Sequence, residues 1–136
     1  MSEIKVNTLT GKTTAGNITV TSEGGAVTMQ LQQGLAKSWC KWKMVGTQTV
    51  NDSFGITSIQ DNGTGRTELS ATNSMSTADY VIVGMSRDGG GYNDNANCAM
   101  SETSTPTASN FEIFCTHGAA PNDASSAFVV TLGDLA

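Results

Sequence analysis

Residues 38–44 constrain the fold more than any other segment, because apolar side chains at Cys40, Trp42 and Met44 alternate with lysines at 41 and 43. In an extended strand, one face would carry Cys40, Trp42 and Met44, and the other Trp39, Lys41 and Lys43. This period of two is typical of a half-buried β-strand. The chain is therefore expected to contain a sheet with one face in a core and the other exposed.

Further strand-like runs follow at hairpin spacing, at residues 47–50, 54–59, 66–71, 80–85, 110–115 and 127–132. The turn cluster at residues 61–65 predicts a hairpin, because the pair Asn62-Gly63 accepts positive φ. The run at 80–85 is continuously apolar and predicts a central strand buried on both faces. Two polar loops, 86–97 and 116–125, are expected between strands. We expect about six to eight strands in a β-sandwich or jelly-roll-like domain over residues 38–136.

Composition supports an all-β fold and excludes several function classes. Thr, Ser, Asn and Gly fill 58 of 136 positions, and these residues favour strands and turns over helices. With a net charge of −5 and 7 Lys plus Arg, the chain has no broad cationic face, so nucleic acid is not an expected partner. The N-terminus does not resemble a cleaved signal, and no window approaches the roughly 20 apolar residues of a membrane span. Membrane insertion is not expected.

Residues 1–24 are predicted to form an extended arm. Its two short alternating runs, 4–9 and 17–21, offer few apolar side chains, among them Ile4, Val6 and Leu9. Two such strands are at best marginally stable alone, so this arm needs a partner and is interpreted as an attachment segment.

Residues 25–37 predict the one short helix, because Val27, Leu31 and Leu35 recur at four-residue spacing. A helix of two or three turns containing Gly34 is too weak to persist alone. We therefore expect three copies to pack these side chains around a threefold axis, as the junction of a homotrimer.

Candidate catalytic and metal-binding groups are few. Cys40, Cys98 and Cys115 contain no C-x-x-C pair, so buried free thiols are expected, with a Cys98–Cys115 bridge left open. His117 is the only histidine, which excludes a multi-histidine metal site within one chain. Most carboxylates lie in or beside turns, and the strand residue Glu112 has no obvious partner. We predict neither an enzyme nor a cofactor.

The loop at residues 88–97 is the predicted receptor contact, with 116–125 beside it. Its candidate contact residues are Asp88, Tyr92, Asn93, Asp94 and Asn95. An aromatic ring beside amides and carboxylates suits a sugar. Calcium is an alternative ligand, although the loop lacks the glutamate that ends an EF-hand loop.

The segments at 31–39 and 51–65, together with the opening Ile4-Lys-Val-Asn-Thr-Leu9, resemble short fibre proteins of tailed bacteriophages, particularly marine ones. In that family a GLAKAW-type motif, here Gly34 to Trp39 with Ser38 in place of Ala, introduces the globular domain. The resemblance implies a trimeric head or tail fibre in the virion. Such a fibre is attached to other virion proteins and contacts a host surface glycan or protein. The alternatives are a capsid decoration or stabilising protein without a receptor, and a small carbohydrate-binding module.

Overall fold

The computed structural model describes residues 4–12, 18–21, 25, 28–31, 34–87, 96–101 and 104–136. Over these residues the protein is all-β and contains no helix, which confirms the all-β part of the predicted fold class. The chain divides into two units, residues 1–35 and residues 36–136, which are described separately.

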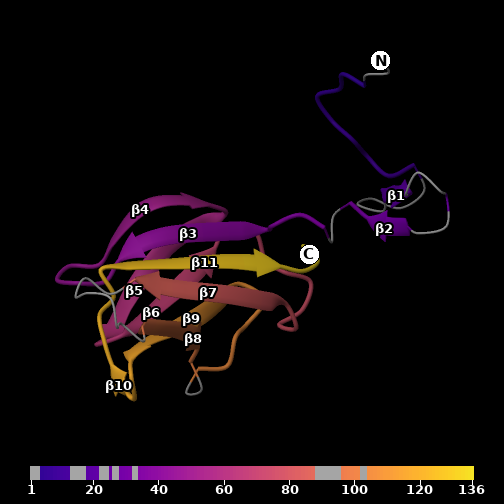
Figure 1. Ribbon diagram of the computed structural model, residues 1–136. Coiled ribbons are helices and arrows are strands. Elements are labelled where there is room, and N and C mark those ends of the chain that lie inside the picture. Colours follow the sequence, from indigo (N-terminus) through magenta and orange to yellow (C-terminus); the bar gives the residue numbers. More distant parts are fainter. Residues whose placement is uncertain are drawn as a thin grey trace. The chain divides into compact units, whose positions relative to one another are not determined.

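The first unit contains one antiparallel hairpin. It pairs β1 (Thr19–Thr21) with β2 (Thr28–Gln30), so that Thr19 lies opposite Gln30 (Figure 1). The backbone N–H of Leu31 extends the pairing by donating to the Ile18 carbonyl over 2.7 Å. Residues 4–12 form no strand, and Ile4, Val6 and Leu9 are all exposed.

The helix predicted over residues 25–37 is wrong where the structure describes them, because Thr28–Gln30 is a strand. A helix this short gains little from propensity, and Gly34 weakens it further. Pairing with β1 satisfies the same backbone groups at once. Leu31 is half-buried, Leu35 is exposed, and Val27 lies outside the described residues.

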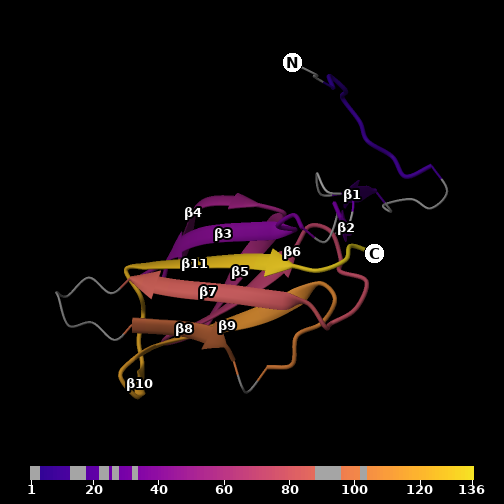
Figure 2. The ribbon, with the colours of Figure 1, turned by 45° about the vertical axis from the view of Figure 1, so that its right-hand side comes forward.

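The second unit is a sandwich of two antiparallel sheets (Figures 1 and 2). The first sheet has the order β4-β3-β11-β7, built from β3 (Ser38–Lys43), β4 (Thr49–Phe54), β7 (Val81–Arg87) and β11 (Ser126–Leu132). The second has the order β10-β9-β6-β5, with β8 also paired to β9. Its strands are β5 (Ile56–Gly63), β6 (Arg66–Ala71), β8 (Ala96–Met100), β9 (Asn110–His117) and β10 (Ala120–Pro121).

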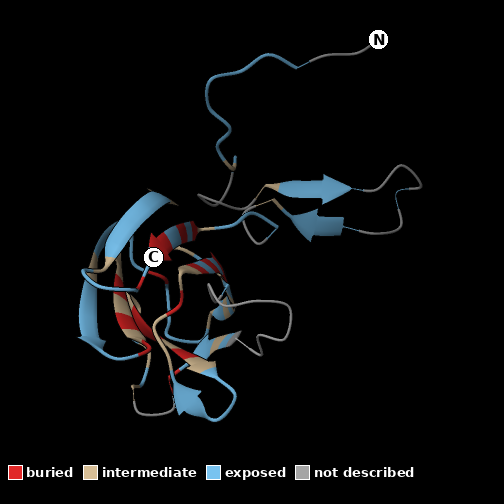
Figure 3. Ribbon diagram, turned by 60° about the vertical axis from the view of Figure 1, so that its left-hand side comes forward, coloured by how far each residue is buried: buried red, intermediate tan, exposed pale blue. Residues whose placement is uncertain are grey.

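The core lies between the inner faces of these sheets, where the buried residues of Figure 3 concentrate. The predicted facing of β3 is confirmed, because Cys40, Trp42 and Met44 are buried while Lys41 and Lys43 are exposed. From the opposite sheet, Leu69, Phe111 and Ile113 complete the cluster. Burial of these apolar side chains supplies the main driving force for folding.

Hydrogen bonds satisfy the polar groups around Trp42 inside this core. The Trp42 indole Nε1–H donates to Thr67 Oγ1 over 3.1 Å, and the Thr67 hydroxyl donates to Gln48 Oε1 over 2.6 Å. This chain of bonds joins the two sheets, because Trp42 lies on β3 and Thr67 on β6. Unpaired polar groups at these depths would each cost about 1–3 kcal/mol.

Three strand-level expectations need correction. β7 is an edge strand of its sheet, not a central one, and its residues alternate between exposed and half-buried. Strands β8 and β10 occupy parts of the segments predicted as loops. The hairpin at β5–β6 is confirmed, but its turn residues are Thr64 and Gly65, with Asn62 still in the strand.

The expectation of buried free thiols is correct for Cys40 and wrong for Cys98 and Cys115. Cys98 on β8 lies directly opposite Cys115 on β9, and the two form a disulfide. Cys40 is a free, buried thiol. Burial raises its pKa to about 11, with the Asp52 charge adding to the effect, so the thiol stays protonated and unreactive near neutral pH.

Candidate functional site

The sandwich has two ends of different construction. The chain arrives at one end, where the Lys37 N–H donates to the Thr131 carbonyl over 2.8 Å beside the start of β3. The β4–β5 connection lies at the same end, since Phe54, the last residue of β4, pairs with Trp39 near the start of β3. The end of β6 lies there too, because the Thr72 N–H bonds to the Gly55 carbonyl over 2.9 Å. We call this the junction end.

The opposite end, here called the loop end, gathers three connections that are distant in sequence. The Met44 N–H donates to the Ala124 carbonyl over 3.1 Å, which joins the end of β3 to the segment before β11. The Gly65 N–H, in the β5–β6 turn, donates to Asp123 Oδ1 over 2.7 Å. Since β3 spans six residues, the two ends lie about 20 Å apart at roughly 3.3 Å per residue.

Gly65 is required for this loop packing. Its φ of +72° lies in the left-handed region, and a Cβ there would collide with the Cys115 carbonyl oxygen and approach Asn122 N at 2.9 Å. Only glycine can adopt this positive φ and also leave room for the neighbouring backbone atoms without strain. The residue thereby lets the hairpin turn rest against β9 and the segment that follows β10.

The predicted receptor residues Asp88, Tyr92, Asn93, Asp94 and Asn95 lie outside the described residues. Their segment joins the last residue of β7, Arg87, to the first residue of β8, Ala96. Arg87 accepts a 2.7 Å hydrogen bond from Ser125 Oγ, and Ala96 pairs with His117. Both attachment points therefore lie beside residues 116–125, as predicted. His117 is an exposed residue at the end of β9.

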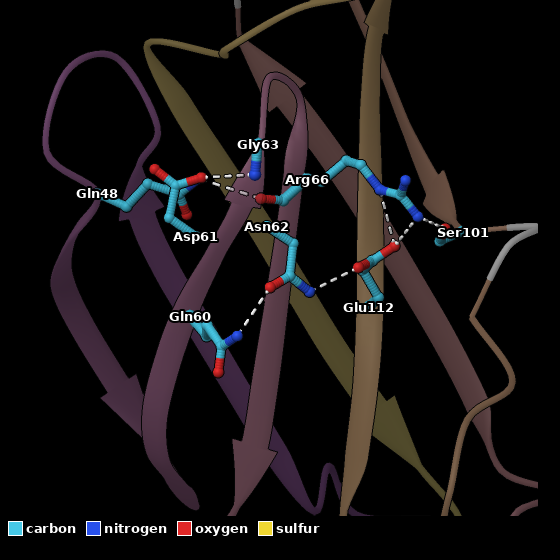
Figure 4. Close-up of polar contacts among 8 residues, drawn as sticks. All are labelled: Gln48, Gln60, Asp61, Asn62, Gly63, Arg66, Ser101 and Glu112. Atoms are coloured by element: carbon cyan, nitrogen blue, oxygen red, sulfur yellow. Dashed lines mark hydrogen bonds and ion pairs between the residues drawn. The ribbon is translucent and has the colours of Figure 1, made fainter.

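A polar cluster on the outer side of the second sheet surrounds Glu112 (Figure 4). Arg66 donates to Glu112 Oε1 from Nε over 3.1 Å and from Nη2 over 2.7 Å, and Asn62 Nδ2 donates to Oε2 over 2.7 Å. The Glu112 side chain is 5% exposed and that of Arg66 33% exposed. Arg66 Nη2 also reaches Ser101 Oγ over 3.3 Å.

Burial raises the pKa of Glu112, but hydrogen bonds from Ser101, Asn62 and Arg66, together with the Arg66 charge, outweigh it and leave the pKa below its ordinary value. The carboxylate is thus held ionised and fully occupied by donors. A group in this state cannot serve as a general acid near neutral pH. The cluster is consistent with a structural role that fastens β5, β6 and β9 together.

Sequence reasoning missed the partners of Glu112. Asn62 and Arg66 lie 50 and 46 residues away, and only the register of β6 with β9 brings them together. The sequence pattern places Asn62 in a turn, whereas in the structure its side-chain amide donates to Glu112. The sequence does place the opposite charges of Arg66 and Glu112 on two predicted strands, which is compatible with an ion pair. It does not show that these two strands are neighbours in the sheet.

Among the described residues, no group of three or more His, Cys, Asp or Glu side chains is placed to hold a metal ion. Within the same part of the chain, no helix is long and apolar enough to cross a membrane. No family model, no curated protein and no solved structure matches this chain.

Proposed function

We propose that this protein is a structural component of a bacteriophage particle, a trimeric fibre without enzymatic activity. Residues 1–24 attach it to other virion proteins, and the loop end of the sandwich faces the host surface. One observation carries the proposal: the chain enters the sandwich at the end opposite the clustered loops. An attachment segment at one end leaves the other end free for contact.

The resemblance of residues 34–39 and 51–65 to phage fibre proteins supports the same function. The exposed apolar residues Ile4, Val6 and Leu9 suit a segment that becomes ordered against a partner. At the loop end, recognition residues would be presented by a rigid β-scaffold, the usual arrangement of binding loops. Three copies would raise a weak single-site affinity through avidity.

Adsorption competition tests the receptor role. The purified full-length protein should reduce adsorption of the phage that encodes it to host cells, because it occupies the same receptor. A Tyr92→Ala/Asn93→Ala variant should lose this competition while keeping its melting temperature. The matched control is Asn73→Ala/Ser76→Ala, two exposed residues between β6 and β7 at the junction end, which should compete like the wild type.

Mass spectrometry of purified particles separates the proposal from its alternatives. A fibre should be present in particles and also compete for adsorption. Presence without competition by the wild type would establish a capsid decoration or stabilising protein. Absence from particles, with sugar binding by the isolated chain, would instead identify a carbohydrate-binding module and overturn the virion role.

A further inference from the structure

The outer faces of the two sheets differ sharply in chemistry. The face of β5, β6 and β9 is covered by hydrogen-bonded polar side chains, including the Glu112 cluster and the bond from Asn110 Nδ2 to Glu68 Oε1 over 3.2 Å. The face of β4, β3, β11 and β7, here called the apolar face, instead carries large hydrophobic residues that are 36% to 68% exposed: Trp39, Phe54, Val81, Val83, Met85, Phe128 and Val130.

Strand register makes the apolar face continuous. Phe54 pairs with Trp39, Trp39 with Val130 and Val130 with Val83, so one row crosses all four strands. The neighbouring row runs from Asp52 through Lys41 and Phe128 to Met85. In that row Lys41 Nζ lies 5.4 Å from the centre of the Phe128 ring, which adds a cation–π contact.

The exposed hydrophobic area of the apolar face is large enough for much of a protein–protein interface. Its seven hydrophobic residues expose on the order of 600 Å², which reaches the upper limit of the largest apolar patch on a typical monomer. A stable interface buries about 800 Å² on each partner, so this patch with its rim would form most of one. Lys41 and Asp52 lie opposite each other near the middle of this face, so their charges balance there. Lys43 and Arg87 lie on the same face at the loop end, so a second copy would meet unbalanced positive charge only at that rim.

We propose that the apolar face packs against the same face of other copies of this chain. The face spans four neighbouring strands of one sheet, and interfaces between identical subunits are more apolar than other interfaces. A charged partner would find only Lys41 and Asp52 at the middle of the contact. Copies meet either as a face-to-face pair or around a threefold axis. The inference that copies associate does not depend on the proposed function. Only the expectation of three copies rests on it.

The test measures the mass of the full-length protein in solution. Multi-angle light scattering and sedimentation velocity at micromolar concentration should give an oligomer for the wild type. Val83→Lys and Phe54→Lys, at the two edges of the same row, should each weaken self-association about tenfold or more, since a buried charge would be unpaired. Val45→Lys is the control, because Val45 is similarly exposed, at 47%, but lies in the β3–β4 connection.

Circular dichroism and melting temperatures establish that each variant remains folded, and both β3–β11 pairing and the core should be retained because the changed side chains point outward. A wild-type monomer at micromolar concentration would overturn the inference. So would an oligomer that neither lysine variant weakens. The outcome is separable from the virion role. An oligomer that is absent from particles would support the interface without the virion role, and a monomer that competes for adsorption would support the receptor role without the interface.

Discussion

Replacing Glu112 with Gln probes a buried carboxylate whose hydrogen-bond partners are defined. The substitution preserves shape but removes the charge that Arg66 and Asn62 bind. A hydrogen bond to a charged group contributes about 1.5–3 kcal/mol. Because Arg66 is one-third exposed, solvent screening reduces its share. Glu68 lies directly opposite Glu112, so removing one charge also relieves a repulsion. We expect a net loss of about 2 kcal/mol at pH 7.

The loss should depend on pH in a defined direction. The folded-state pKa of Glu112 is depressed, so its carboxylate stabilises the fold above the unfolded pKa of about 4.3. That contribution falls as pH drops through the folded pKa. The difference in unfolding free energy between wild type and Glu112→Gln, measured by urea denaturation, should therefore be constant near neutrality and shrink as the solution becomes acidic.

Glu68→Gln is the matched control, since Glu68 faces Glu112 across the same pair of strands and accepts one hydrogen bond from Asn110. We expect it to change stability by less than about 0.5 kcal/mol, as surface substitutions usually do. Equal losses in the two variants, or a loss in Glu112→Gln that does not vary with pH, would refute the assignment of the Glu112 cluster as a stabilising ion pair.

Three further tests address the core, the loop end and the disulfide, each by denaturation of the purified protein. Trp42→Phe should lose about 2 kcal/mol, because it removes the indole donor to the opposite sheet and leaves space in the core. Gly65→Ala should lose at least about 2 kcal/mol, whereas Gly46→Ala, at a similar φ of +73° in open space, should lose about 1 kcal/mol. Cys98→Ala/Cys115→Ala should lose about 3 kcal/mol, as expected for a 17-residue loop, and the effect of a reducing agent on stability should disappear with it.

The sequence predicted the elements whose signal is local. Alternation in residues 38–44 gave the correct buried face of β3, and the Asn62-Gly63 pair indicated the β5–β6 hairpin within two residues of the observed turn. These patterns persist because the side-chain period of a strand does not depend on its neighbours.

The wrong predictions concern features that depend on which strands lie beside each other and which faces of the sheets are covered. The apolar run of β7 indicates burial on both faces, but Val83 and Met85 lie on the outer face of the sheet, where they are exposed like Phe128 and Val130 of β11. The four-residue spacing before Ser38 indicates a helix over too short a window to exclude a strand, and pairing with β1 decided the outcome. β8 was missed because its pairing to β9 and the Cys98–Cys115 bridge are long-range contacts.

The most direct test of the proposed function is a cryo-electron microscopy reconstruction of the particles of the phage that encodes this chain. The sandwich should fit density projecting from the particle with its junction end, at Lys37, toward the particle. The turn at Gly118, at the loop end, should lie about 20 Å farther out. Density that fits only with the loop end buried against the particle, or particles that lack the protein, would contradict the account.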